Sequence, residues 1–153
     1  MSKTYKAAIT EAMKEAMDTK SNSLIIGQGV TDFKGIFDTI KGFNKKYPNR
    51  IIETPLAEDS VAGICIGASL NGAYPINTHI RADFGLLIFN QLINLAAKYK
   101  YMFGGLFEIP SMYRMIIGRS WGQGAQHSQS LQSLMAHIPG LVVVMPSDPK
   151  SII

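Results

Sequence analysis

The sequence predicts an α/β domain with three layers: a mainly parallel sheet with helices on both of its faces. Short apolar runs alternate at least five times with segments of helical periodicity, which is the pattern of such a domain. One run, residues 141–145, is apolar at every position, as is typical of a strand covered on both sides of a parallel sheet. The 153 residues fit one domain, without internal repeats or low-complexity linkers.

The composition is that of an ordinary globular protein, 46% hydrophobic and 17% charged. The apolar stretches are far shorter than the ~20 residues that span a bilayer, and the first residues lack the apolar core of a secretion signal, so we expect a cytoplasmic protein. The single cysteine, Cys65, excludes a disulfide within the chain and every multi-cysteine metal site. Because the lysines behind the net charge of +4 are scattered, we expect no nucleic-acid partner.

The chain is predicted to begin with a helix and a buried strand. Residues 5–20 carry apolar side chains at helical spacing, and Thr4 can cap this helix. Residues 23–27 read as a short strand that ends in a turn, Gly27-Gln28-Gly29. We interpret this turn as a strand end, because no third glycine follows at the spacing of a dinucleotide-binding loop. A short helix over 36–41 and a strand over 51–52 follow.

The next stretch places a carboxylate at the mouth of a helix. Pro55 ends the strand at 51–52, and the small and apolar residues beyond it predict a buried helix with Asp59 and Ser60 as capping types. Glu58 precedes this helix, where a carboxylate is costly to desolvate and could exchange a proton near neutral pH. Three small residues at helical spacing leave room for another backbone: Gly63, Gly67 and Ala68.

The second half is predicted to continue the alternation, and it carries two further candidate residues. The expected elements are a strand at 74–79, a helix at 86–100, a strand at 110–117, a helix at 131–137 capped by Ser128 or Ser130, the strand at 141–145 and one helical turn from Ser147. Phe84 lies in the loop before the helix at 86–100. His127 follows the glycine-rich loop 118–124.

Glu58, Phe84 and His127 each come soon after a predicted strand. Since ligands bind outside the carboxyl ends of parallel strands, these three side chains are the candidates for one site. Alternatives remain for two of them: Phe84 could be a loop aromatic that covers the core, and His127 a capping or loop histidine. We interpret His79 and His137 as structural.

Several motifs resemble the beta subunits of thiamine-diphosphate-dependent 2-oxoacid dehydrogenases, of the pyruvate and branched-chain type. Residues 52–63, Ile-Glu-Thr-Pro-Leu-Ala-Glu-Asp-Ser-Val-Ala-Gly, look like the cofactor-glutamate motif of that family, and residues 126–129, Gln-His-Ser-Gln, match its histidine motif. Residues 83–105 are similar to the passage between these motifs. The resemblance implies a transketolase-like pyrimidine-binding domain over residues 1–153, cut before the C-terminal domain of the family.

The resemblance also implies roles for the three candidates. Glu58 would hydrogen-bond the pyrimidine ring of thiamine diphosphate and promote the tautomer that activates the cofactor. Phe84 would stack on that ring, and His127 would act on the 2-oxoacid substrate as an acid–base or positioning group. The family holds the diphosphate and Mg²⁺ through a Gly-Asp-Gly motif on an alpha subunit. That motif is absent here, so we expect no metal ligand in this chain, an alpha-type partner and oligomerisation through the face of Gly63.

The sequence departs from the family at several positions and leaves the substrate open. Gln28 replaces a usual acid, Arg81 is an unusual charge near the expected substrate side, and residues 114–118 lack the usual Arg-x-Pro-x-Gly. One alternative function is transfer on sugar phosphates, as in transketolase or deoxyxylulose-phosphate synthase, with Arg81 and Arg119 as phosphate candidates. Another is a non-catalytic module that only binds a partner.

Overall fold

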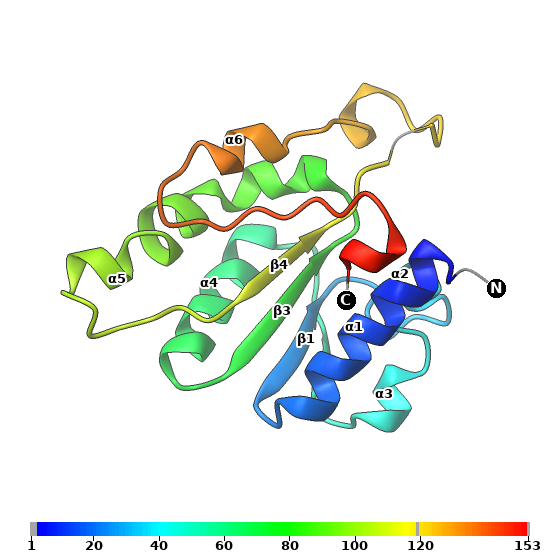
Figure 1. Cartoon of the computed structure of the whole chain (residues 1–153), viewed down its shortest axis with the longest axis horizontal. Coiled ribbons are helices and arrows are strands. Elements are labelled where there is room, and N and C mark those ends of the chain that lie inside the picture. The colour runs from blue at the N-terminus through cyan, green and yellow to red at the C-terminus, as the bar shows by residue number, and fades with distance from the viewer. Residues whose placement is uncertain (1–2, 119, 153) are drawn as a thin grey trace.

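A four-stranded, wholly parallel sheet forms the centre of the molecule (Figure 1). The computed structural model describes residues 3–118 and 120–152. The strands are β1 (Ser23–Gly27), β2 (Ile51–Glu53), β3 (Tyr74–His79) and β4 (Met112–Met115), and their order across the sheet is β2-β1-β3-β4. This confirms the predicted parallel α/β architecture, and the bounds of β1 and β3 agree with the prediction residue for residue.

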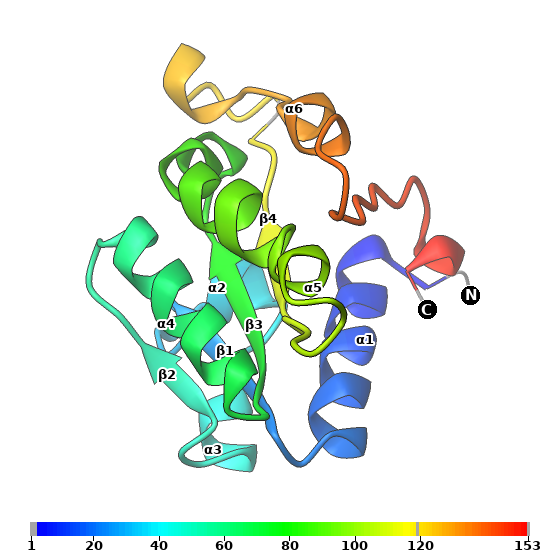
Figure 2. The ribbon, with the colours of Figure 1, turned by 90° about the vertical axis from the view of Figure 1, so that its left-hand side faces the viewer.

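Helices lie on both faces of the sheet, as predicted. Figure 2 shows α1 and α4 on opposite sides of the strands. The α-helices, in chain order, are α1 (Tyr5–Thr19), α2 (Gly35–Asp38), α3 (Phe43–Lys46), α4 (Glu58–Leu70), α5 (Tyr99–Met102) and α6 (Gln132–Ala136). Other helical turns are η1 (Ala82–Ile88), η2 (Gln91–Ala96), η3 (Ala125–His127) and η4 (Pro149–Ser151). None of the helices in the described residues has the length and apolar character needed to cross a bilayer.

The alternation of side chains along the strands produces the two cores. Ile25 and Ile76 point to one face, where they pack with Met17 of α1 and with residues of α2 and α3. Ile26 points to the other face and packs with Val61 of α4. Helix α1 begins as predicted, because the Thr4 hydroxyl accepts a hydrogen bond from an amide of its first turn.

Helix α4 differs from its prediction in two respects. It begins at Glu58 rather than after it, and Asp59 and Ser60 do not cap it, because both already lie in its first turn and the Asp59 carboxylate accepts hydrogen bonds from Ser60. The helix is also buried on one side only. A Cβ added at Gly63 or Gly67 would meet no other atom within 4 Å, so the small-residue face is open.

In place of the single helix predicted over 86–100, the chain forms three successive helical segments of different types, and the first begins at Ala82. These are η1, which is a 3₁₀ helix, η2, which is a π-helix, and α5. Phe84 therefore lies inside η1 rather than in a loop. The short helix predicted over 36–41 is likewise replaced by α2, a distorted turn with positive φ at Ile36 and Phe37, and by the separate α3.

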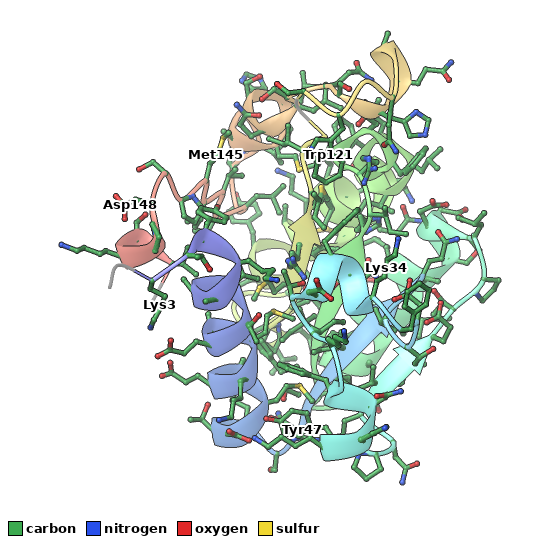
Figure 3. The ribbon with its side chains drawn as sticks, turned by 90° about the vertical axis from the view of Figure 1, so that its right-hand side faces the viewer. Lys3, Lys34, Tyr47, Trp121, Met145 and Asp148 are labelled. Carbon is green, nitrogen blue, oxygen red and sulfur yellow. The ribbon has the colours of Figure 1, made fainter. Side chains whose placement is uncertain are left out.

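The predicted strand over 141–145 is absent from the sheet, and the predicted caps of α6 are wrong. Val142 is 92% exposed and Val144 72%, so this apolar run has no cover that would make pairing with a sheet favourable. Leu131, without a side-chain bond, occupies the capping position of α6. The chain then returns to the start of α1, where Figure 3 shows Met145 near that helix, and the Tyr5 hydroxyl donates to the carbonyl of Pro146.

Truncation of Ile76 tests the core between the sheet and α1. Ile76 is fully buried in the middle of β3, so Ile76→Ala should lower the free energy of unfolding by about 2–5 kcal/mol through lost burial and a cavity. The measurement is urea unfolding followed by circular dichroism. As a matched control, Leu106→Ala removes the same kind of side chain where it is exposed, and it should change stability by less than about 0.5 kcal/mol. Equal effects of the two variants would contradict this packing.

Candidate active site

A cavity opens at the carboxyl edge of the sheet, beside the first turn of α4. The empty space here, open solvent included, is about 360 Å³. Its walls come from the ends of β1 and β3, from the segment after β2 and from η1. The strands β1 and β3 meet closely here because residue 27 is glycine. A Cβ on Gly27 would lie 2.4 Å from the carbonyl oxygen of Thr78, which only glycine avoids.

Glu58 and Phe84 line this cavity together. Both side chains are half-buried. Within residues 3–118 and 120–152, no group hydrogen-bonds the Glu58 carboxylate, so its oxygens are available to a ligand. The position of Glu58 in the first turn of α4 also suits a negative charge, because the amide groups of that turn point toward it. The structure thus brings together two of the three predicted residues.

His127, the third candidate, contacts Phe84. The two rings meet edge to face, with centroids 5.4 Å apart and planes at 87°. A carboxylate fixes this arrangement: Oδ1 of Asp83 accepts hydrogen bonds from the Gln129 side-chain amide at 2.8 Å and from the Gln129 backbone at 3.2 Å. Asp83 precedes Phe84 and Gln129 lies two residues after His127, so this pair of bonds holds the two motifs against each other.

The turn after β1 forms a further wall of the cavity. Gln28 lines it, at the position where the resemblance leads one to expect an acid. The turn is held by the Glu53 carboxylate, which accepts hydrogen bonds from the Gly29 amide and from the amide and hydroxyl of Thr31. Glu53 was not among the predicted site residues, because its role depends on the pairing of β1 with β2.

His79, interpreted from the sequence as structural, lies in the same cavity as Glu58. It is buried, and its Nε2 lies 2.8 Å from Oδ1 of Asn77. Burial lowers the pKa of His79 to about 4, so the ring is neutral at pH 7. A signal in the sequence could have found this residue: Asn77 and His79 are two positions apart at the end of a strand, and therefore share one face.

Arg81 does not line the cavity, contrary to the expectation that it lies on the substrate side. Its guanidinium group turns into the glycine-rich loop, where Nε donates to Gln123 at 2.9 Å and the charge sits 4.4 Å from the centre of a Trp121 ring. No carboxylate in the described part of the chain pairs with it. Arg81 thus fastens the loop that leads to His127. Arg119 lies outside the described residues.

The cavity suits a flat, nitrogen-containing ring. It offers a carboxylate without a partner among the described residues, an aromatic side chain on one wall and a neutral imidazole on another, which together can bind ring nitrogens and cover a ring face. In the described ranges, no group of three His, Cys, Asp or Glu side chains is placed to hold a metal ion. The arrangement can therefore bind and orient an organic ring and exchange a proton with it through Glu58.

Comparison with known proteins places the sequence beside one family. The profile of the family described as "Transketolase, pyrimidine binding domain" matches residues 1–152. The chain is 37% identical, over 94% of its length, to the acetoin:2,6-dichlorophenolindophenol oxidoreductase subunit beta of Cupriavidus necator. It is 38% identical, over 98% of its length, to the mitochondrial pyruvate dehydrogenase E1 component subunit beta of Bos taurus.

These relatives are longer than the chain, which covers 46% of the first and 43% of the second. A solved structure, "Split gene transketolase, inactive beta4 tetramer", superposes on 97% of the chain, which covers 44% of that protein, with a TM-score of 0.73 and 19% identity. The low identity of this last match speaks for the fold alone. It agrees with the parallel sheet and the two helical layers described above.

The buried His79 makes the stability of the chain depend on pH. The pKa of an unfolded histidine is 6.5 and that of His79 in the folded chain is about 4, so between these values the unfolded chain binds more protons. The His79 contribution is complete above about pH 6.5 and is lost as the pH falls toward 4, by about 3 kcal/mol in total. Urea unfolding at several pH values measures this loss.

A pair of variants isolates the contribution of His79 from that of other groups. His79→Phe removes the titrating ring from the cavity, so its stability should fall less than that of the wild type between pH 6.5 and 4. His137 is exposed, and His137→Phe should keep the dependence of the wild type. The same slope in all three proteins would show that His79 is accessible to protons in the folded chain.

Proposed function

We propose a function for this chain from the premise that it belongs to the transketolase pyrimidine-binding domain family: it holds the pyrimidine ring of thiamine diphosphate in a 2-oxoacid dehydrogenase. The observation that carries this proposal is the shared cavity of Glu58 and Phe84 at the carboxyl edge of the sheet. The names of the relatives, subunits beta of pyruvate dehydrogenase E1 and of an acetoin oxidoreductase, support it. The activity is oxidative decarboxylation of a 2-oxoacid.

Glu58 and Phe84 bind and orient the ring. The Glu58 carboxylate has no other partner within the described residues, and it accepts a hydrogen bond from a protonated ring nitrogen. Such a charge-assisted bond is shorter and stronger than a neutral one. Phe84 supplies an aromatic surface for the ring, and His127 holds Phe84 at its edge. Together these contacts fix both the plane of the ring and the direction of its nitrogen.

The chemistry is shared between cofactor and chain. When bound, thiamine diphosphate supplies the carbon nucleophile for the 2-oxo group of the substrate. Glu58 holds the proton at the ring nitrogen by accepting its hydrogen bond, from a half-buried position in the wall of the cavity. His127 is not among the residues that line the cavity, but it contacts Phe84, which does, and from there it can position the substrate or transfer a proton to it.

A second subunit completes this site. As the resemblance to the beta subunits implies, the diphosphate and its metal belong to an alpha-type partner. The open face of α4 with Gly63 and Gly67 gives such a partner, or a second copy of the chain, room for close approach. The relatives are subunits by name, which supports assembly with another chain.

The alternative of sugar-phosphate transfer has less support. It requires cations near the cavity, and Arg81 is turned into the glycine-rich loop instead. A module that only binds a partner would need neither a carboxylate beside an aromatic wall nor a histidine held against that wall by a dedicated pair of hydrogen bonds. Both features are present here.

The test is to exchange the carboxylate for its amide while keeping its shape. With an alpha-type subunit added, Glu58→Gln should lower the rate of 2-oxoacid decarboxylation by about 10²–10⁴-fold, because the amide cannot exchange a proton with the ring. Asp59→Asn is the matched control. It removes an identical charge from the next position of the same helical turn, where the carboxylate accepts hydrogen bonds from its neighbour Ser60, and it should retain nearly full activity.

Both the assembly and the chemistry are measured in this experiment. Calorimetry follows thiamine diphosphate binding, and release of carbon dioxide follows turnover, with and without the partner. If Glu58→Gln is as active as Asp59→Asn, Glu58 is an ordinary helix-terminal carboxylate. In that case the proposed function is wrong, whatever the partner does.

A further inference from the structure

His79 has no part in the function proposed so far, although it lies in the same cavity as Glu58 and Phe84. Its ring stands at the last position of β3, on the face of the sheet that α4 covers. Buried imidazoles normally have a partner for each ring nitrogen. His79 has one for Nε2, and Nδ1 has none among the described residues. The second nitrogen therefore remains available to a ligand.

The hydrogen bonds beneath His79 determine which nitrogen carries the proton. The side-chain amide nitrogen of Asn77 donates to the carbonyl of Ile26 at 3.1 Å, which directs the amide oxygen of Asn77 toward His79. This oxygen is only an acceptor, so Nε2 of His79, 2.8 Å away, must be the donor. A neutral ring with a proton on Nε2 has a lone pair on Nδ1. The pairing of β1 with β3 thus makes Nδ1 of His79 a hydrogen-bond acceptor.

The cavity then presents two acceptors, the Glu58 carboxylate and Nδ1 of His79, beside the aromatic wall of Phe84. A ligand that complements it is a planar ring with two separate N–H donors. An aminopyrimidine protonated on its ring nitrogen has both: one on that nitrogen and one on the exocyclic amino group. This complementarity rests on the proposed function, in which Glu58 takes the ring nitrogen.

We propose that His79 is a positioning residue that accepts a hydrogen bond at Nδ1 from the exocyclic amino group of the bound aminopyrimidine. Contacts at two points of its edge fix the ring against rotation in its own plane, which stacking on Phe84 alone cannot do. The contact also provides specificity. An analogue with hydrogen or oxygen in place of the amino group leaves a buried acceptor without a donor, and this is costly.

The tautomer is tested first, on the wild-type chain and without any ligand. Nitrogen-15 NMR of the histidine rings distinguishes a protonated Nε2 from a protonated Nδ1. We expect the Nε2–H tautomer for His79 at pH 7, and a shift of the Nδ1 signal toward that of a hydrogen-bonded acceptor when thiamine diphosphate is added together with the alpha-type subunit. A proton on Nδ1 in the free chain would overturn the proposal without reference to any cofactor.

Two variants separate the nitrogens of His79 in a binding experiment. The amide of His79→Asn reaches the place of Nδ1 and retains an acceptor there, whereas the amide of His79→Gln reaches the place of Nε2 and retains only the contact with Asn77. Calorimetry on the chain assembled with its partner compares thiamine diphosphate with its 4′-deamino analogue. The wild type and His79→Asn should prefer the amino form by about three- to tenfold, and His79→Gln should show no preference.

The outcomes distinguish this proposal from the function on which it rests. If the wild type binds thiamine diphosphate and His79→Gln keeps the full preference for the amino form, the role of His79 is refuted and that of Glu58 stands. If the wild type binds neither compound, the proposed function fails, and the inference fails with it. Because unfolding of a variant would abolish binding of both compounds, the preference between them, rather than affinity alone, is the quantity compared.

Discussion

The close approach of β1 and β3 at Gly27 is the constraint on which the site depends. With no side chain there, the backbone of β1 reaches Thr78, and the two strands end together. The same pairing places Ile26 opposite Asn77, so the carbonyl of Ile26 can orient the Asn77 amide and, through it, His79. A larger residue at position 27 would separate the strands and disturb the floor of the cavity.

A second constraint joins parts that are distant in the sequence. Phe84 follows β3 and His127 follows β4, and neither local structure determines where the other lies. The Asp83 carboxylate connects them by its two hydrogen bonds to Gln129. Arg81 also helps to fix His127, because its contacts with Gln123 and Trp121 hold the loop before that residue. Phe84 and His127 thus lie in the short helical turns η1 and η3 that follow the strands, and buried polar contacts fix these turns against each other.

Much of this architecture could be predicted from the sequence, because it depends on local patterns. The sequence pattern marks both ends of β3, the strand that ends at His79. Glu58, Phe84 and His127 follow strands whose carboxyl ends must meet at one edge in a parallel sheet. Other features depend on tertiary contacts. The apolar run 141–145 has the composition of a strand, yet Val142 and Val144 in it are exposed, so no cover stabilises it as a strand. That His79 lines the cavity beside Glu58 also depends on tertiary contacts, because its partner Asn77 is oriented by the Ile26 carbonyl of the neighbouring strand.

The most direct test of the proposed site is an experimental structure of the chain assembled with an alpha-type subunit and thiamine diphosphate. We predict the pyrimidine ring in the cavity at the carboxyl edge, with a ring nitrogen within hydrogen-bond distance of the Glu58 carboxylate and the ring face against Phe84. A pyrimidine ring bound away from this cavity, or a cavity filled by a side chain of the partner, would contradict that prediction.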